Sequence, residues 1–330
     1  MVNVGIYLDL RNPAEWRQDW SRLYGFTLEL CEEADRLGVH SIWTTEHHGF
    51  DDGYLSQPLT MAAAIAARTK RARIGTGVTV APIRHPAHLA EEAAIVDLVS
   101  GGRLELGIGT GYRLPEYELF DRGDVLKTKF SATDASAREI RRLWDTGTIT
   151  PPPVQERPRI WLGYQGPQGA RRAGLLGESL LTANPDMAAP YLDALREGGH
   201  DVANARMAGL LNGWITDDPE ADWPLVSRHL SHQWDSYHRY AVEGTGAEPP
   251  PDQRGPLARA RPVLRARSLP VRYPRGGRAR HQGVRGGHPH RDGVVLRVAQ
   301  RDARRGGAPT REHPVHPPRA VARVSTAPDA

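Results

Sequence analysis

The chain has 330 residues, one cysteine and a formal net charge of +4, and it contains no apolar run of the roughly 18 residues that a membrane-spanning helix needs. Its charge is divided unevenly: Gln253–Ala330 holds 18 arginines, no lysine and four acids, or +14, which leaves −10 on the rest of the chain. An acidic body gives no reason to expect nucleic acid as a partner. The opening MVNVGIYLDLRNP is typical of a strand and a turn rather than a signal peptide, so we expect a cytoplasmic protein that binds no membrane.

Up to about residue 245, short apolar runs alternate with segments whose apolar residues recur at the three-to-four spacing of a helix. The expected strands are Val2–Leu8, His40–Thr45, Ala72–Ala81, Arg103–Ile108, Arg159–Gly163, Ser179–Thr182 and Arg206–Ile215. The expected helices are Trp20–Leu37, Pro58–Thr69, Ala87–Leu98, Ser136–Trp144, Gln168–Leu176, Asp186–Glu197 and Asp222–Val242. This repetition predicts a parallel sheet covered by helices, either doubly wound or closed as a (β/α)8 barrel, whose eighth strand is missing from the pattern. Cys31 lies at helical spacing and is predicted to be a packing residue.

The stretch His40–Asp52, HSIWTTEHHGFDD, is an apolar run that stops at Glu46, His47 and His48. This order is typical of a buried barrel strand whose carboxyl end opens into an active-site mouth. Consecutive side chains of a strand point to opposite faces, so both histidines turn inward only if the strand has already ended. Two adjacent histidines at a strand end are also common as ordinary surface or core groups, and the sequence leaves both readings open.

Gly107–Tyr112, GIGTGY, ends the fourth expected strand and lets a flat ring or a phosphate approach the backbone closely, although a tight turn explains the same glycines. It lacks the glycine spacing of a dinucleotide fingerprint, and the segment RLPEYELFDRGD that follows is read as non-helical. Phosphate-loop, serine-hydrolase and structural zinc motifs are absent from the sequence. His47, His48, His85 and His88 fit no familiar metal-ligand spacing, so no metal is expected.

The order and spacing of these motifs closely resemble the bacterial luciferase-like superfamily of flavin-dependent oxidoreductases. The resemblance rests on EHHGFDD after a strand and on IGTGVTVAPIRHPAHLAEEAAIVDLVSGGRLELGIGTGY, and it extends from Val2 to about Gly244. It implies a (β/α)8 barrel, reduced FMN in the barrel mouth, and catalytic residues at His47, His48 and Glu46, with His47 the stronger acid/base candidate. It also implies a separate flavin reductase, dioxygen and a small organic molecule as partners, and a homodimer.

The resemblance further implies a non-prolyl cis peptide at Gly77-Val78 beneath the flavin ring and a phosphate site at the start of the Gln168 helix, where free N–H groups favour an anion. The implied cofactor-binding residues are Gly77, Val78, Gly109, Thr110, Tyr112, Gly163, Tyr164, Gln165 and Gly166. Thr110, Tyr164 and Gln165 depart from the charged or hydroxyl residues that luciferase uses around the ribityl chain and phosphate. Some relatives use a deazaflavin coenzyme, which stays open here.

From Gln253 the chain contains no Ile, Phe, Trp, Met, Lys or Asn and shows no periodic apolar pattern, so we predict a disordered tail. Tyr273 is its only aromatic residue, which argues against base stacking. GC-rich codons for Tyr273–Arg319, read one nucleotide later, permit a T-P-E-E helix start, a strand TVLFCASL and a further helix. We therefore divide the chain into a barrel domain, 1–245, and an Arg/Pro/Gly-rich tail, 246–330, that is out of frame.

Four hypotheses follow, of which the last is a basic tail, Gln253–Ala330, that binds nucleic acid. The first is a monooxygenase in which reduced FMN and dioxygen oxidise a small organic substrate. The second is a deazaflavin-dependent hydride-transfer enzyme on the same barrel, and the third is a non-catalytic flavin-binding protein. If the tail is out of frame, this chain is expected to have lost stability or activity.

Overall fold

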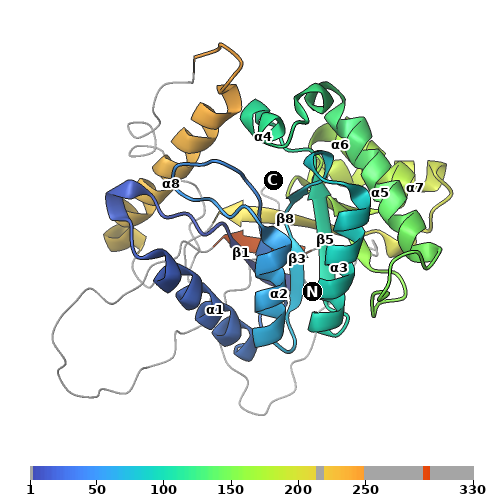
Figure 1. Cartoon of the computed structure of the whole chain (residues 1–330), viewed down its shortest axis with the longest axis horizontal. Coiled ribbons are helices and arrows are strands. Elements are labelled where there is room, and N and C mark those ends of the chain that lie inside the picture. The colour runs from blue at the N-terminus through green and yellow to red at the C-terminus, as the bar shows by residue number, and fades with distance from the viewer. Residues whose placement is uncertain (1–2, 213–218, 249–292, 298–330) are drawn as a thin grey trace, which may run out of the picture.

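The alternation of strands and helices predicted from the sequence closes on itself in the structure. The computed structural model describes residues 3–212, 219–248 and 293–297. Its parallel sheet has the order β3-β2-β1-β9-β8-β7-β6-β5-β4, and a further pairing of β3 with β5 returns the sheet to its start. Helices surround these strands in Figure 1. The predicted luciferase-like (β/α)8 barrel is therefore confirmed.

The strands are short, and those from β2 to β7 are mostly buried, as expected for a parallel sheet covered by helices. They are β1 (Asn3–Leu8), β2 (Ser41–Thr44), β3 (Arg73–Thr76), β4 (Thr79–Val80), β5 (Leu104–Gly109), β6 (Arg159–Leu162), β7 (Ser179–Leu181), β8 (Met207–Asn212) and β9 (Gly293–Arg297). β3 and β4 share one barrel position, because the single strand predicted at Ala72–Ala81 is interrupted at Gly77-Val78.

The helices follow the strands in turn. They are α1 (Trp20–Arg36), α2 (Pro58–Arg68), α3 (Pro86–Ser100), α4 (Leu114–Leu119), α5 (Lys129–Asp145), α6 (Gly166–Leu176), α7 (Ala188–Glu197) and α8 (Pro219–Val242). Two predictions need correction. Helix α5 begins seven residues before the predicted Ser136, and the segment read as non-helical contains α4, whose start is favoured by Pro115 in its first turn.

The core lies between the barrel and its helices. It includes Leu8, Ile42, Ile74 and Leu106, each with no exposed surface, and burying such a side chain contributes roughly 1.5–3 kcal/mol. Cys31 packs in the same cluster, and burial raises the pKa of its thiol to about 12, which confirms its predicted packing role. Inside the barrel a second cluster joins Tyr7, Trp43, Trp161 and Ala208.

The eighth barrel position, predicted to be missing, holds β9. This five-residue strand pairs in parallel with β1 and β8, so seven barrel positions come from the residues before 245, as predicted, and a strand from the tail lies at the eighth. Among the described residues, no helix follows β9. The remaining tail, for which we predicted disorder, lies outside the described residues, and the domain boundary at residue 245 stays a prediction.

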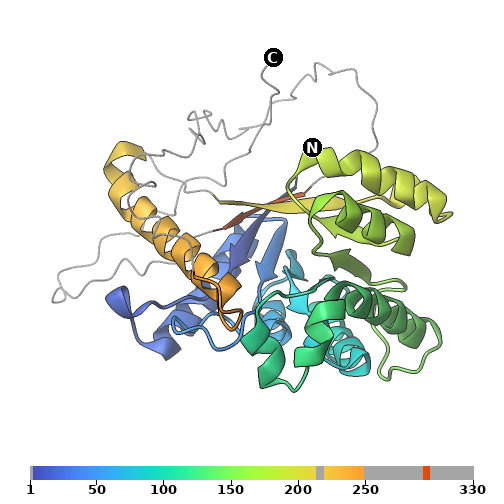
Figure 2. The same cartoon turned by 90° about the horizontal axis from the view of Figure 1, so that it is seen from above.

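Helix α8 leaves the regular ring. In Figures 1 and 2 it runs in orange beside the blue N-terminal segments, where it contacts the loops after β1 and β2. Tyr240 receives a hydrogen bond from the Asp51 backbone N–H at 2.9 Å, and His232 lies 2.9 Å from Asp52. Helix α8 therefore lies against the loops at the carboxyl ends of β1 and β2.

Candidate active site

The polar residues of interest gather at the carboxyl ends of the strands. β2 ends at Thr44, so Glu46, His47 and His48 lie in the loop beyond it and are not bound to alternate between two faces. All three side chains are buried. In barrels of parallel strands this end forms the mouth in which reactions occur.

His47 is held by an acid that the sequence analysis did not identify. Its Nδ1 lies 2.7 Å from Oε1 of Glu116, on α4. An ionised carboxylate only accepts hydrogen bonds, so Nδ1 carries the proton of this bond and Nε2 is the ring atom left for chemistry. The ring stacks on Phe50 at 4.5 Å between centroids and meets Tyr54 at 4.7 Å and Tyr112 at 5.3 Å.

His48 pairs with Glu46 and not with Glu116, the partner of His47. His48 Nε2 lies 2.7 Å from Glu46 Oε1, which also receives a hydrogen bond from Arg84 at 3.0 Å. The other oxygen of Glu46 accepts the Val80 backbone N–H at 3.0 Å. Both carboxylate oxygens of Glu46 are therefore engaged, and its geometry suits bracing the loop against β4 better than exchanging protons.

The same acid, Glu116, also fixes the backbone of this loop. Its Oε1 accepts the N–H of His48 at 3.0 Å, while its Oε2 is buried without a hydrogen-bond partner. Arg113, one turn earlier, donates to the His48 carbonyl at 2.5 Å. Sequence reasoning missed Glu116 because α4 was not recognised. The Pro at the start of LPEYEL is the signal that would have placed it on a helix.

The predicted cofactor residues Gly77, Val78, Gly109 and Gly163 meet at one place. The Gly77-Val78 peptide is cis, as expected from the resemblance. A Cβ at Gly109 would lie 2.5 Å from Val78 Cγ2, and one at Gly163 would lie 2.5 Å from Val78 Cγ1. Val78 therefore sits between the ends of β5 and β6 in a space that only glycines leave open. We call Gly77, Val78, Gly109 and Gly163 the Val78 shelf.

The other predicted cofactor residues differ in where their side chains lie. Thr110 donates to the Gly111 carbonyl at 2.8 Å, and Tyr112 places its ring beside His47 with a buried hydroxyl that has no partner. Tyr164 instead turns outward and donates to Asp134 on α5 at 2.6 Å. Its hydroxyl therefore joins the loop between β6 and α6 to α5.

Gln165 and Gly166 mark the start of α6. Gln165 is its exposed N-cap residue and makes no capping hydrogen bond with its side chain. Gly166 has φ +72°, a left-handed conformation that favours glycine. The helix starts after the carboxyl end of β6, so its unpaired N–H groups lie at the mouth end of the barrel.

Four tyrosines and Arg11 extend the mouth toward α8. Burial raises the pKa of the Tyr54, Tyr112 and Tyr237 hydroxyls, which remain protonated donors at neutral pH. Tyr54 and Tyr237 share a hydrogen bond of 2.9 Å, and Tyr7 lies close enough to raise both of their pKa values. Arg11 stacks over Tyr54 at 4.6 Å and over Tyr237 at 4.8 Å.

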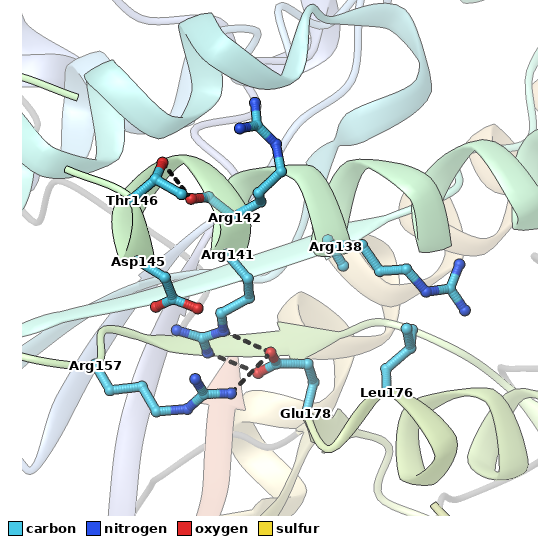
Figure 3. Close-up of a pocket in the computed structure, with 9 residues that line it drawn as sticks. Arg138, Arg141, Arg142, Asp145, Thr146, Arg157, Leu176 and Glu178 are labelled. Carbon is cyan, nitrogen blue, oxygen red and sulfur yellow. Dashed lines mark hydrogen bonds and ion pairs between the residues drawn. The ribbon is translucent and has the colours of Figure 1, made fainter. Parts of the chain in front are cut away.

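A cavity of about 400 Å³ lies at the opposite end of the barrel, where Arg157 and Glu178 precede β6 and β7. Figure 3 shows Arg141 and Arg157 directed toward Glu178. Nε and Nη2 of Arg141 donate hydrogen bonds to the Glu178 carboxylate at 2.6 and 2.7 Å. Arg157 also lies 3.8 Å from Glu178, so this carboxylate is shared by two arginines. Within the described residues, no group of three His, Cys, Asp or Glu side chains suits a metal ion, and none of the described helices is long and apolar enough to cross a bilayer.

Three curated relatives share part of the chain. It is 36% identical over 165 residues to the oxygenase component of a flavin-dependent trigonelline monooxygenase from Acinetobacter baylyi, covering 46% of each chain. It is 30% identical to 4-hydroxyprotoasukamycin monooxygenase from Streptomyces nodosus, covering 58% of this chain and 59% of the relative. An F420-dependent glucose-6-phosphate dehydrogenase from Amycolatopsis mediterranei is 28% identical, with 54% and 59% covered. The chain thus spans about half the length of these relatives.

Two solved structures share the fold. Monooxygenase RslO1 from Streptomyces bottropensis superimposes with a TM-score of 0.65 at 25% identity, covering 78% of this chain and 84% of that one. A type II Baeyer-Villiger monooxygenase from Pseudomonas putida, solved with FMN, gives a TM-score of 0.59 at 19% identity, covering 75% and 81%. The sequence profile of the luciferase-like monooxygenases matches residues 4–285, and the chain belongs to this family.

Proposed function

We propose that the protein is a flavin-dependent monooxygenase that uses reduced FMN and dioxygen to oxidise a small organic substrate. The observation that carries the proposal is the pairing of two features in one mouth: the Val78 shelf, and a histidine whose Nδ1 is fixed by Glu116. The flavin-dependent relatives support the cofactor class. A separate flavin reductase is proposed as the source of reduced FMN.

The residues present fit a flat cofactor. Because Gly109 and Gly163 have no Cβ, the Val78 side chain fits between them. A ring system can therefore lie over the shelf without meeting a side chain at either glycine. The buried hydroxyl of Thr79 has no partner and offers a hydrogen bond to a ring oxygen or nitrogen. The start of α6 would hold the phosphate through its N–H groups. When bound, reduced FMN supplies the electrons that activate dioxygen.

His47 is the proposed acid/base. With Nδ1 donating to Glu116, Nε2 takes or returns a proton on the side of Tyr54 and Tyr112. Glu116 sets the tautomer and would stabilise the protonated ring. The aromatic side chains around His47, together with α8, would exclude water from the reacting atoms.

A deazaflavin-dependent hydride-transfer reaction is the second candidate, because relatives named F420-dependent dehydrogenases share the matched region. A third outcome, flavin binding without catalysis, shares the same mouth. Only the cofactor bound and the consumption of dioxygen distinguish these possibilities.

The test is a titration of the full chain with oxidised FMN, reduced FMN and a deazaflavin, followed by substrate-dependent uptake of labelled dioxygen. The variant Gly109→Ala drives a Cβ into Val78, and we expect it to weaken FMN binding about tenfold or more. The control is Gly25→Ala on α1, where an added Cβ meets no other atom within 4 Å. Deazaflavin binding without FMN binding would exclude the monooxygenase, and FMN binding without oxygen uptake in a broad substrate screen would favour the non-catalytic protein.

Homodimerisation is proposed as well. Ile95, Leu98 and Val99 are exposed at the i, i+3, i+4 spacing of one face of α3. A contiguous apolar stripe on a surface helix is typical of a protein contact. Molar mass in solution, compared between the chain and Val99→Glu, tests this assignment.

A further inference from the structure

Arg11 is a buried arginine that is only partly paired. It follows β1, its side chain is 7% exposed, and its Nη1 donates to Ser236 of α8 at 2.5 Å. The same nitrogen lies 3.3 Å from Asp52 Oδ2. Its other two nitrogens, Nε and Nη2, are buried and make no hydrogen bond. Because a buried donor without a partner is destabilising, these two nitrogens are a place where the acceptor atoms of a ligand would be held.

The two unpaired nitrogens form one edge of the guanidinium plane. The N–H bonds of Nε and Nη2 point in the same direction, and this edge binds the two oxygens of a carboxylate side by side. Asp9 comes within 3.5 Å of Nε but makes no hydrogen bond with it. Asp9 offsets part of the charge of this edge, but neither Nε nor Nη2 donates a hydrogen bond to a described acceptor.

A second unpaired donor lies in the same space. The hydroxyl of Tyr112 is buried without a partner, and Arg11 is close enough to lower its pKa against the larger raising effect of burial. The ring of Tyr112 is 5.3 Å from that of His47, and Arg11 stacks over the rings of Tyr54 and Tyr237. The free edge, the hydroxyl and the proposed acid/base thus share one aromatic chamber.

Two carboxylates share the charge of Arg11: Asp9 Oδ2 lies 3.5 Å from its Nε, and Asp52 Oδ2 lies 3.3 Å from its Nη1 and 2.9 Å from His232 Nε2. The recognition of a carboxylate ligand therefore rests on the unfilled hydrogen-bond donors Nε and Nη2 and not on a surplus of positive charge. Aromatic walls reduce competition from water and suit a planar ring.

We propose that the substrate of this site is a small aromatic carboxylate. Its carboxylate is held by the Nε/Nη2 edge of Arg11 and the Tyr112 hydroxyl, and its ring lies among the tyrosines beside His47. This inference rests on the proposed function for the reaction that follows, but the binding step is independent of flavin. Arg11 would then orient the ring for oxidation while the Val78 shelf holds the cofactor.

Calorimetric titration of the full chain with benzoate and with its neutral isostere benzamide tests the proposal. We expect benzoate to bind at least about tenfold more tightly than benzamide, because only the carboxylate engages both N–H groups. Arg11→Lys keeps the charge but loses the planar edge and should weaken benzoate at least about tenfold while changing FMN affinity less than about twofold. Arg138→Lys, in the cavity of Figure 3, is the matched control and should bind benzoate as the parent chain does.

Equal affinity for benzoate and benzamide in the parent chain overturns the proposal, and this comparison holds even if Arg11 variants fold poorly. It is overturned equally if Arg11→Lys retains benzoate affinity, if Arg138→Lys loses it, or if benzoate does not bind at millimolar concentration. FMN binding in the same preparations is read separately. Benzoate selectivity without FMN binding refutes the proposed function and keeps this inference, whereas FMN binding without benzoate selectivity does the reverse.

Discussion

At the scale of single residues, side chains that look equivalent in the sequence have different partners in the mouth. His47 and His48 are neighbours, yet His47 pairs with Glu116 in an aromatic chamber while His48 pairs with Glu46. The sequence places both at a strand end but contains no sign of which partner each would find, because Glu116 is 69 residues from His47. Such pairings arise only when strand ends come together.

Replacing Glu116 by Gln should reveal its positioning role. The amide keeps the size of the side chain but removes the charge that stabilises a protonated His47, so we expect substrate-dependent turnover to fall by about 10- to 100-fold. The pH profile of kcat/KM should move with it, whereas FMN affinity should stay within about twofold. Glu118→Gln, at an exposed position of the same helix, is the control. An unchanged pH profile would show that Glu116 has only a structural role.

Asp35 contributes stability that depends on pH. Burial tends to raise the pKa of its carboxyl, but the backbone N–H groups of Ala72, Lys70 and Arg71 outweigh burial and lower it below its usual value. A lowered pKa in the folded state means that the stabilisation is present above the unfolded pKa, near 3.9, and is lost as pH falls through the folded value.

Asp35→Asn should therefore lower the free energy of unfolding by about 1–3 kcal/mol at pH 7, because the carboxylate accepts three N–H groups at 2.6 to 3.0 Å. The difference from the parent chain should shrink below pH 4, when Asp35 itself becomes protonated. Urea unfolding at several pH values measures both quantities. Asp193→Asn, on the surface of α7, should have little effect, and a pH-independent loss at Asp35 would contradict this account.

At the scale of elements, the order of strands and helices is largely predictable and their packing is not. The α8 helix was expected at Asp222–Val242 and is found at Pro219–Val242. Its periodic apolar residues predict a helix, but periodicity does not say which loops it contacts. The α4 helix was missed because six residues carry too little periodicity to identify. The direction of the Tyr164 side chain could not be predicted, because residues beyond the end of a strand point in several directions.

The hydroxyl of Tyr240 is one of the groups that attach α8 to the loop after β2, and a single substitution removes it. Tyr240 accepts the Asp51 N–H and donates to the Asp51 carboxylate, each at 2.9 Å. Tyr240→Phe removes both hydrogen bonds and should lower the free energy of opening α8 from the barrel by about 1–2 kcal/mol. The effect should be measured mainly as faster amide hydrogen exchange in α8 and in the Asp51 loop. Tyr24→Phe on α1 provides the comparison. Uniform acceleration across the barrel would indicate global destabilisation instead.

At the scale of the whole molecule, the barrel could be predicted because each β-α unit repeats the same pattern, whereas the last unit could not. In the shifted reading of the tail, the strand TVLFCASL occupies positions 292–299. The strand β9 lies at nearly the same positions, Gly293–Arg297. The barrel therefore takes a strand at the point where the shifted frame supplies one, although the written residues there are GVVLR. This agreement in position is compatible with the frameshift hypothesis, which the nucleotide sequence tests.

Three variants of the chain decide how the barrel is completed: the chain as written, a chain ending after residue 248, and one whose tail is restored to the shifted frame. If the written tail is out of frame, the first two should unfold at nearly the same temperature. The restored chain should gain several degrees, since each kcal/mol raises Tm by about 2–4 °C in a domain of somewhat smaller size. A complete seam buries both the edge of β1 and the edge of β8, so the restored chain should also bind FMN more tightly. Loss of stability on deleting the written tail would instead make β9 a genuine part of the barrel, and early stop codons in the shifted frame of the nucleotide sequence would end the frameshift hypothesis.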